Sequence, residues 1–571
     1  MPKIKDEEKM ARYVLISDTT LSHSYRDFPL LDFLPSAPSD QLPNFIYNYL
    51  KGKTPRDDDG RASFAPYALR KIESSLLLRY EARDVVVANE DSIEQFINED
   101  TELIGVSTMD PFGLGPLTMS YSVLFQTDAP AFVYKEFQRL LRRINRAREK
   151  KKAKLVVGGP GVWELTVRPE ETKNLNIDYA FQGEADDVVC DLFQYLGGDF
   201  SESSEFYRGF QTFDSSFRKR GVGGNDRFIT RHQFSRQFPK LEDIPPIVNP
   251  SVKGMVEVMR GCGVGCDFCE VTLRPLRYCS PKQVRKEIEV NVKAGIHHAW
   301  LHSDEIFAYE HGRNYVPNEE ALSDLFKVVM QTKGVASTNP THGRISIPAA
   351  YPELLKKISG IIKAGPDNWI GLQVGVETGS DRLARMHMPN KTLPLKIGPD
   401  GSWKDIVWRG TYVMNKYYWR PAFTVQVGQN GESEEDNWET VALINRMSNS
   451  ELDDGRPFEF TITPMQNVPL GLIKRRGFAG TQLLSESQLA VYYASYRHLE
   501  KLARRNALSD AKGNPFSRLG TAFLIGSGGW AMLRVVSAMC KKAGLDVDKA
   551  ARHGLDEKLP QAPSLLPAGH L

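Results

Sequence analysis

The sequence predicts a multidomain α/β protein with two successive series of parallel strands and a mostly helical C-terminal region. Short apolar strands alternate with amphipathic helices along most of the chain, which is typical of parallel sheets covered by helices. The chain has 571 residues, enough for about three or four domains. Glycine-rich loops follow several of the predicted strands. Because ligands bind at the carboxyl ends of parallel strands, we expect a binding site where these loops meet.

The first series predicts a doubly wound parallel sheet within residues 1–200. Short apolar runs indicate its strands, and apolar residues at helical spacing indicate its helices. The strands are expected at residues 13–16, 84–88, 102–107, 155–157 and 177–181, and the helices at 65–81, 92–98, 130–150 and 187–196. The polar residues 201–250 predict a linker.

The second series predicts a partial (β/α)6 barrel within residues 251–475. Its strands are expected at residues 255–259, 299–302, 344–347, 370–376, 420–427 and 458–462, and its helices at 281–294, 319–332, 351–363, 403–416 and 434–447. Residues 476–571 predict a mostly helical domain with a mobile tail. Within that domain, glycines interrupt the apolar segment 520–536, which we expect to be buried.

Composition and charge argue against several classes of partner. The net charge is +2, so nothing indicates a nucleic-acid partner. The chain lacks 18 consecutive apolar residues, and its charged N-terminus does not resemble a signal peptide, so we expect no membrane association. Six cysteines in 571 residues do not form a disulfide framework and indicate a reducing compartment. We therefore expect a cytoplasmic protein.

The most informative motif is a Cys-x3-Cys-x2-Cys triplet formed by Cys262, Cys266 and Cys269. Three thiolates can hold three irons of a 4Fe–4S cluster, which four cysteines normally bind. The fourth iron is then open to a substrate or cofactor, as in catalytic metal sites. An aromatic residue before the third cysteine, Phe268, completes the pattern.

Two other interpretations of the triplet remain open. The cysteines are either free thiols in a loop or part of a structural zinc site, for which Cys279 is the obvious fourth ligand. Besides these four, the chain contains only Cys190 and Cys540. A second iron–sulfur cluster is therefore not expected.

Two glycine-rich loops, at residues 107–116 and 158–161, follow strands of the first sheet. Glycines at such positions let the backbone approach a bulky ligand closely. A pair of tight strand-to-helix turns without a ligand explains the loops equally well.

Together, the triplet and the loops resemble the class B cobalamin-dependent radical S-adenosylmethionine (SAM) methyltransferases. The chain from the triplet to about residue 470 resembles their radical SAM core. The first half is similar to their flavodoxin- or Rossmann-like cobalamin-binding domain in residues 65–73, 107–116, 157–161 and 182–184. The Asp-x-His-x-x-Gly motif of many cobalamin domains is absent, and the surroundings of His23 do not fit it.

The resemblance implies roles for particular residues. Cys262, Cys266 and Cys269 would be catalytic and would bind the cluster. Asp304 or Glu305 would contact the SAM amino group. The other implied SAM contacts are Glu377, Gln426 and Gln429, and the implied cobalamin contacts are Ser107, Thr108, Asp110, Pro111, Gly113, Gly115, Gly158, Gly159, Pro160, Gly161, Gln182, Gly183 and Glu184.

The resemblance also implies a reaction. One SAM would methylate cobalamin, and a second would be cleaved by the reduced cluster to a 5′-deoxyadenosyl radical. That radical would take hydrogen from an unactivated sp3 carbon, which then collects methyl from methylcobalamin. A low-potential electron donor is required. The specific hypothesis for the substrate is a protein residue, a glutamine of methyl-coenzyme M reductase.

Three other functions remain possible on the sequence alone. They are natural-product methylation, a radical SAM isomerase or cyclase, and an iron–sulfur binding or sensing protein without turnover. Tyr278 and Tyr309 are either aromatic contacts near the cluster or core residues. The basic run 142–154 is either a solvated helix face or a docking site for an acidic protein.

Overall fold

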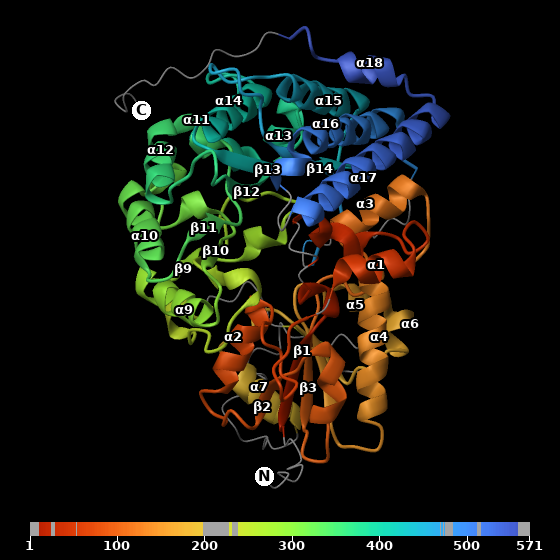
Figure 1. The fold of residues 1–571 in the computed structure, drawn as a ribbon, viewed down its shortest axis with the longest axis vertical. Coiled ribbons are helices and arrows are strands. Elements are labelled where there is room, and N and C mark those ends of the chain that lie inside the picture. Colours follow the sequence, from red (N-terminus) through yellow and green to blue (C-terminus); the bar gives the residue numbers. More distant parts are fainter. Residues whose placement is uncertain are drawn as a thin grey trace.

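The computed structural model describes residues 11–23, 25, 29–52, 54–197, 228–230, 238–468, 470–471, 473, 483–510 and 515–557. Figure 1 shows the N-terminal sheet in the lower part of the molecule and the second series of strands above it. Helices α16 (Glu486–Asp510) and α17 (Pro515–Lys542) lie in the upper part, beside the second series of strands.

The N-terminal sheet has six parallel strands in the order β2-β1-β3-β4-β5-β6. They are β1 (Tyr13–Ser17), β2 (Val85–Val87), β3 (Leu103–Ser107), β4 (Lys154–Gly158), β5 (Tyr179–Gln182) and β6 (Phe228–Thr230). The first five are the predicted strands, whereas β6 lies within the segment predicted as a linker. The strand order reverses between β1 and β3, which is where doubly wound sheets bind ligands.

Helices cover both faces of this sheet because alternate residues of its strands point in opposite directions. Val14 and Ile16 pack on α4 (Phe132–Ala147), whereas Tyr13 and Leu15 face α2 (Tyr67–Leu76) and α7 (Val189–Gly197). The sequence did not predict two further helices, α1 (Asn44–Lys51) and α3 (Pro116–Phe125). Two short helices, α5 (Glu164–Val167) and α6 (Pro169–Lys173), follow β4.

The second half contains six parallel strands in sequential order. They are β7 (Met255–Glu257), β10 (His298–His302), β11 (Ser337–Pro340), β12 (Ile370–Glu377), β13 (Trp419–Val427) and β14 (Thr461–Gln466). They form two three-stranded sheets, which a bridge between His342 and Gln373 connects. The covering helices are α9 (Pro281–Lys293), α10 (Glu319–Gln331), α11 (Ser346–Ala350), α12 (Pro352–Ile361), α13 (Asp381–His387), α14 (Trp403–Lys416) and α15 (Glu434–Ser448).

The prediction of a strand at residues 344–347 is wrong. Helix α11 begins there, and the third strand of the second series is β11, which ends before this segment. The sequence of β11 did not indicate a strand because its inner face is polar: Ser337 and Asn339 both hydrogen-bond His298. The last predicted strand, 458–462, is also displaced, since β14 begins at Thr461.

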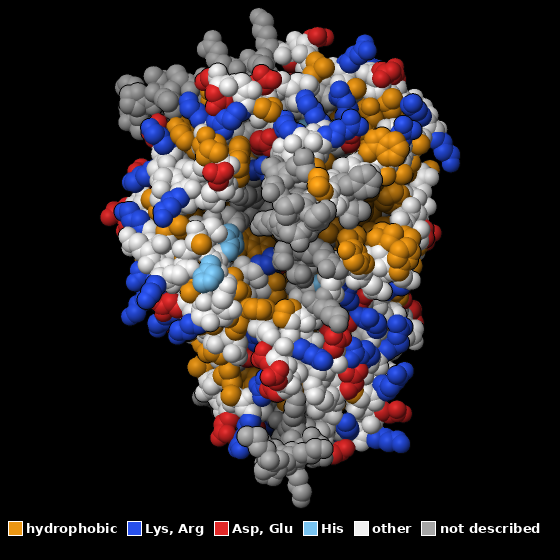
Figure 2. All heavy atoms as spheres, viewed as in Figure 1, with side chains coloured by type: hydrophobic (Ala, Val, Ile, Leu, Met, Phe, Trp, Pro, Cys, Tyr) orange, Lys and Arg blue, Asp and Glu red, His pale blue; other side chains and the backbone are white. Residues whose placement is uncertain are grey.

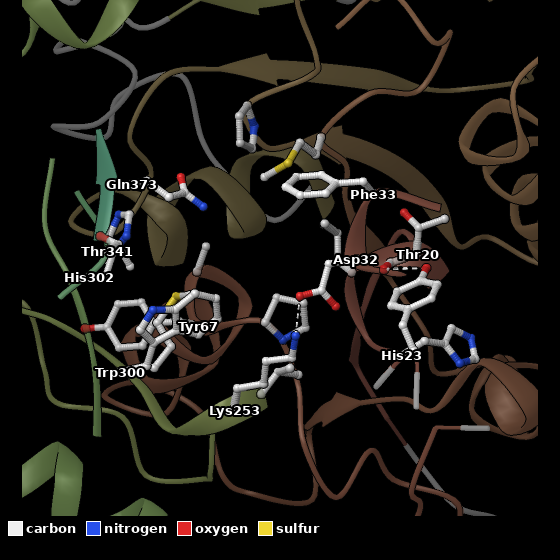
Figure 3. Close-up of a pocket in the computed structure, with 18 of the residues that line it drawn as sticks. Thr20, His23, Asp32, Phe33, Tyr67, Lys253, Trp300, His302, Thr341 and Gln373 are labelled. Atoms are coloured by element: carbon white, nitrogen blue, oxygen red, sulfur yellow. Dashed lines mark hydrogen bonds and ion pairs between the residues drawn. The ribbon is translucent and has the colours of Figure 1, made fainter. Parts of the chain in front are cut away.

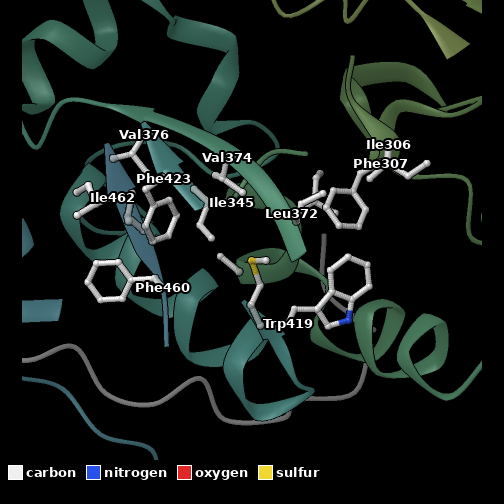
Figure 4. Packing of buried hydrophobic residues seen from close by; sticks show 14 of the residues in the cluster. Ile306, Phe307, Ile345, Leu372, Val374, Val376, Trp419, Phe423, Phe460 and Ile462 are labelled. Carbon is white, nitrogen blue, oxygen red and sulfur yellow. The ribbon is translucent and has the colours of Figure 1, made fainter. Parts of the chain in front are cut away.

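The barrel core lies between the strands and their helices. Figure 4 shows Val374 and Val376 of β12 beside Phe423 of β13, with Phe460 and Ile462 next to them. The intervening residues of β13, among them Ala422, Thr424 and Gln426, therefore face the inside of the barrel. This alternation gives the barrel a polar interior.

Three C-terminal helices follow, of which α18 (Val547–Arg552) is the shortest. The prediction of a buried, glycine-interrupted segment at residues 520–536 is wrong. Helix α17 continues through the glycines, and its side chains of Trp530 and Val535 are exposed. Within the described residues, the helices are too short or too polar to cross a membrane.

Candidate functional site

The cysteine triplet lies in a loop that follows β8 (Met259–Arg260), near the carboxyl end of β7. Gly261 and Gly265 have φ values of +84°, which L side chains rarely adopt. A Cβ at Gly261 would also lie 2.6 Å from the carbonyl oxygen of Pro275. Gly261, just before the first cysteine, and Gly265, between the first two, are therefore needed for the loop conformation.

Side chains from three other segments hold this loop. The Asp304 carboxylate, after β10, accepts a hydrogen bond from the Gly261 N–H at 2.7 Å. The Asn390 amide donates to the carbonyl of Val264 at 3.0 Å. The Asp267 carboxylate, within the triplet, contacts His387 Nδ1 at 3.0 Å. The loop geometry is therefore defined by the protein itself.

The three thiols are suitable ligands for a cluster. Burial raises the pKa of Cys262 to about 12 and that of Cys266 to about 11, and it also raises the pKa of Cys269. The Lys391 ammonium opposes this shift at Cys266 and Cys269. Without metal the thiols are protonated at neutral pH, so binding iron would release protons.

A group of polar side chains lies next to the triplet at the ends of β12 and β13. The Glu377 carboxylate pairs with Lys391 Nζ at 2.8 Å and accepts a hydrogen bond from Gln426 Nε2 at 2.8 Å. The Gln429 amide donates to the Glu377 carbonyl at 3.3 Å. This group offers one carboxylate and one ammonium, which match the amino and carboxylate groups of an amino acid such as the methionine part of SAM.

Two observations mark Glu377 as unusual. It is buried, and it has a φ of +66° at a bulge between β12 and β13. Such strain in a residue other than glycine is concentrated at functional sites. Sequence reasoning found Glu377 but missed Lys391, which comes from the 3₁₀ turn Pro389–Thr392 and not from a strand end.

The structure separates the two acidic candidates after β10. Asp304 holds the cysteine loop and borders a large cavity. Glu305 is buried, pairs with Arg344 at 3.3 Å and caps the turn that begins at Ile306. The two residues therefore have different partners, although both carboxylates lie near the triplet: Glu305 raises the pKa of Cys262, and Asp304 raises that of Cys269.

The cavity, of about 2670 Å³, lies between the barrel, the N-terminal sheet and the C-terminal helices. Figure 2, viewed as in Figure 1, shows that the molecular surface is hollowed near its middle. In Figure 3, Trp300, His302 and Gln373 of the barrel lie on one side, with Phe33 and Thr20 on the other. Pockets for a single small ligand usually measure roughly 300–1,000 Å³, so this cavity has room for more than one.

The predicted cobalamin contacts fall into two groups. Those that line the cavity are Ser107, Gly158, Gly159, Pro160, Gln182, Gly183 and Glu184. Those outside its lining are Thr108, Asp110, Pro111, Gly113, Gly115 and Gly161. The Asp110 carboxylate is used locally, because it accepts hydrogen bonds from Gly115 N and Thr118 Oγ1.

Of the predicted cluster and SAM residues, Asp304 lines the large cavity. The others lie outside its lining; they are Cys262, Cys266, Phe268, Cys269, Glu305, Glu377, Gln426 and Gln429. The triplet loop nevertheless borders the cavity through Glu270 and Arg274. His23 also lines the cavity, at the N-terminal sheet, with Nε2 3.4 Å from Glu90.

The glycines of the second loop pack against the first loop. A Cβ at Gly159, where φ is +97°, would lie 2.5 Å from the carbonyl oxygen of Thr108, and one at Gly161 would lie 2.2 Å from that of Met109. Both glycines are therefore explained by contact between loops. The sequence interpretation, close approach to a ligand, is not needed at these two positions.

We expect Gly159→Ala to reduce the free energy of unfolding by about 2–4 kcal/mol, because it adds backbone strain and an overlap with Thr108. The measurement is urea denaturation of protein without cofactors. Gly360→Ala is the matched control: it lies in α12 with no atom within 4 Å of the added Cβ, and should stabilise by about 0.5–1 kcal/mol. An unchanged Gly159→Ala protein would leave the ligand explanation standing.

Glu184 and Asp186 connect the N-terminal sheet to the triplet loop. Arg260, two residues before Cys262, donates to Glu184 at 2.7 Å and to Asp186 at 2.8 Å. Arg277 also binds Glu184, at 2.6 Å. The Gln-Gly-Glu stretch, interpreted from sequence as a cobalamin contact, therefore has an ionic role at the interface between the two halves.

The stretch 65–73 has a similar role. Tyr67 donates to Glu287 of α9 at 2.8 Å, and Lys71 pairs with the same carboxylate at 2.9 Å. Arg70 donates to the carbonyl of Pro250 at 2.9 Å. These contacts fix the N-terminal sheet against the barrel.

The remaining candidates from the sequence lie in packed surroundings. Tyr309 is buried and donates to the carbonyl of Cys279, and Tyr278 packs edge-on against it at 5.5 Å. The Cys279 side chain is buried in the barrel core. Among the described residues, no three His, Cys, Asp or Glu side chains are arranged to hold a single metal ion.

Comparison with known proteins gives one family match, which lies in the second half of the chain. Residues 256–444, from β7 into α15, match the radical SAM superfamily. This region contains the cysteine triplet, Asp304, Glu377 and Lys391, so the part of the chain that is similar to the radical SAM superfamily includes the candidate site. No curated protein matches the chain.

Two solved structures of the radical S-adenosylmethionine methyltransferase TsrM from Kitasatospora setae are similar in fold. One, with tryptophan substrate and the SAM analog aza-SAM bound, is 14% identical, covers 76% of this chain and 70% of its own, and has a TM-score of 0.46. The other, with cobalamin and a 4Fe–4S cluster bound, is 14% identical, covers 80% of this chain and 76% of its own, and has a TM-score of 0.45.

Proposed function

We propose that this protein is a cobalamin-dependent radical SAM methyltransferase that acts on an unactivated sp3 carbon. The observation that carries the proposal is a single cavity shared by two sites. Asp304 and the flanks of the triplet loop border it from the barrel, and Ser107 and Gly158 border it from the N-terminal sheet. A cofactor on the sheet would therefore face the barrel across one shared cavity.

The residues of the chain would position the cluster, SAM and cobalamin and would exclude water from them. When bound, the cluster would supply the electron that cleaves SAM, and cobalamin would carry the methyl group. The three thiols would hold the cluster, while Glu377 and Lys391 would orient the amino-acid end of SAM by its opposite charges. Burial of these groups strengthens their electrostatic interactions.

The N-terminal sheet has suitable features for cobalamin. The cavity borders the β1–β3 reversal of strand order, through Leu15 of β1 and Ser107 of β3, where such sheets bind cofactors. Its volume leaves room for a large cofactor beside SAM. The hydroxyl of Ser107 and the amide of Gln182 offer hydrogen bonds at this edge.

We propose a protein residue as the methyl acceptor, with a glutamine of methyl-coenzyme M reductase as the specific candidate, and a low-potential electron donor in the cytoplasm. The basic run 142–154 gives little support to docking of a protein substrate. Arg143 pairs with Glu94, and Lys154 donates to the carbonyl of Leu196, so these side chains are engaged within the domain. A substrate would instead enter beside the exposed Phe45, which borders the cavity on α1.

The test is the cobalamin and iron content of anaerobically isolated protein produced with cobalamin supplied, together with its visible absorption spectrum. We expect one cobalamin and about four irons per chain. A cluster without cobalamin would contradict methyl transfer through cobalamin and would favour an isomerase or cyclase. A product heavier by one methyl group separates methylation from those reactions.

A further inference from the structure

One side of the cysteine loop reaches the surface of the protein. Gly265 and Asp267, the residues on either side of Cys266, are exposed, and 44% of the Asp267 side chain is accessible to solvent. The Cys266 side chain itself is buried. This side differs from the one that borders the large cavity, which the loop meets through Glu270 and Arg274. A cluster bound by the triplet would therefore lie close to solvent at Gly265 and Asp267.

Helix α13 and the loop after β13 continue this exposed surface. His387, the last residue of α13, is buried and contacts the Asp267 carboxylate with Nδ1 at 3.0 Å and the Asn430 carbonyl with Nε2 at 2.7 Å. Met386 is 49% exposed, and Asn430 is exposed as well. We call the exposed residues of this region the α13 surface; they are Gly265, Asp267, Arg385, Met386 and Asn430.

The charges around Met386 differ between its two sides. The Arg385 side chain is 57% exposed, and its ion pair with Asp381 is long, at 3.9 Å. Lys396 is exposed beside it, where Arg385 donates to the carbonyl of the next residue at 3.4 Å. On the side of α15, Glu434 and Glu435 are exposed instead. A partner that covers Met386 therefore needs carboxylates where it faces Arg385 and Lys396.

The cluster would need an electron from outside the chain. Among the six cysteines, only the triplet has the spacing of a cluster motif, so a second cluster that passes the electron on is not expected. In the proposed function SAM, cobalamin and the substrate share the large cavity, which leaves no room there for a second protein. Because electron transfer slows steeply with distance, a carrier has to approach the exposed side of the loop at Gly265 and Asp267.

We propose that the α13 surface is the docking site of a small, low-potential electron-carrier protein that has carboxylates beside its redox group. One electron leaves the reduced carrier and enters the oxidised cluster, so the carrier is oxidised and the cluster is reduced, with no bond formed or broken. Electron-transfer complexes usually bury less than about 1,200 Å², and Met and Arg are enriched in interfaces. This inference rests on the proposed function and adds the docking surface of the electron donor to it.

The test compares a protein reductant with a small one. Anaerobic holoprotein with SAM is supplied either with reduced, acidic flavodoxin below saturation or with dithionite, and 5′-deoxyadenosine is measured. We expect Met386→Glu and Arg385→Glu each to slow the flavodoxin reaction by at least about tenfold, because each places a carboxylate against an acidic partner. The dithionite reaction should keep its wild-type rate, since dithionite needs no docking surface.

A binding measurement without turnover accompanies these rates. Oxidised flavodoxin is titrated calorimetrically into the oxidised holoprotein, and both variants should bind it at least about fivefold more weakly than wild type. Leu78→Glu is the matched control, because Leu78 is 73% exposed just after α2 of the N-terminal sheet. That variant should keep the wild-type affinity and both rates. Equal slowing of the two reactions in the Met386 and Arg385 variants would overturn the assignment, and so would an unchanged flavodoxin reaction in both.

Failure of this assignment can be told apart from failure of the proposed function. If the wild type cleaves SAM with dithionite but binds no flavodoxin, the docking surface is wrong and the radical SAM function stands. If it cleaves no SAM with dithionite, the proposed function fails, while the flavodoxin affinities still decide whether the α13 surface binds a carrier. If Met386→Glu converts a dimer to a monomer in sedimentation and leaves the flavodoxin affinity unchanged, this surface joins two copies of the chain and the assignment fails.

Discussion

A Cys269→Ala variant should retain the fold but lose the intact cluster, and with it both SAM cleavage and methylation. The triplet provides only three protein ligands, so removing one leaves two, fewer than any stable site of this kind has. The loop itself should survive, because Asp304, His387 and Asn390 hold its backbone independently of the metal. We expect 5′-deoxyadenosine and methylated product to fall to background.

The measurement combines iron content, visible absorption and 5′-deoxyadenosine formation in anaerobic protein. Cys190→Ala is the matched control, because Cys190 lies on α7 of the N-terminal sheet, where its thiol contacts the carbonyl of Ser75. That variant should keep wild-type iron content and activity. A Cys269→Ala protein that methylates as well as wild type would contradict the proposed function outright.

Much of the fold could be predicted from the sequence because burial leaves a clear pattern there. The five strands β1 to β5 were found as short apolar runs, since both faces of that sheet are covered by helices. Strand β11 could not be found in this way. One of its faces lies inside a polar barrel, so Ser337 and Asn339 replace the apolar residues that mark a buried strand.

The candidate site was predictable where one short motif contains the chemistry. The cysteine triplet needs no knowledge of the fold, whereas Lys391 is brought beside it by the turn after α13, more than 100 residues later. Nothing local in the sequence distinguishes Lys391 from a surface lysine. Similarly, the sequence places Asp304 and Glu305 together, and only the positions of Gly261 and Arg344 separate their roles.

The loops at the strand ends of the N-terminal sheet show a different limit of prediction from sequence. The resemblance to cobalamin-binding domains in residues 157–161 and 182–184 assigned Gly159 and Glu184 to a bound cofactor. In the structure, Gly159 makes room for Thr108, and Glu184 pairs with Arg260 and Arg277. A residue can therefore be required at a strand end by neighbouring protein as much as by a ligand.

Arg260→Met should be the most destabilising substitution at the interface between the two halves. Arg260 is buried, and its guanidinium binds Glu257, Glu184 and Asp186 at 2.7–2.8 Å. Although burial alone would raise the pKa of Asp186, Arg260 holds that pKa below its usual value. Removing one partner of a buried ion pair costs about 3–5 kcal/mol, because the remaining charges stay buried without compensation.

The loss of stability in Arg260→Met depends on pH, and the direction of the Asp186 pKa shift shows how. A carboxyl group whose pKa is lowered in the folded state stabilises the protein above its unfolded pKa, about 3.9 for Asp, and that contribution disappears as the pH falls through the folded value. In Arg260→Met, Asp186 is left without its cation and should take up a proton at higher pH. The difference between wild type and variant should therefore be largest near neutral pH and shrink below about pH 4.

Urea denaturation at several pH values measures this difference. Arg83→Met is the matched control, because Arg83 pairs with Glu81 at 3.0 Å while both side chains are about 70% exposed. Exposed pairs contribute roughly 0–1 kcal/mol, so this variant should change little at any pH. If Arg260→Met were as mild as Arg83→Met, the ionic contacts would not fix the N-terminal sheet against the triplet loop, and the two halves would have to be held by Lys71, Tyr67 and Glu287 instead.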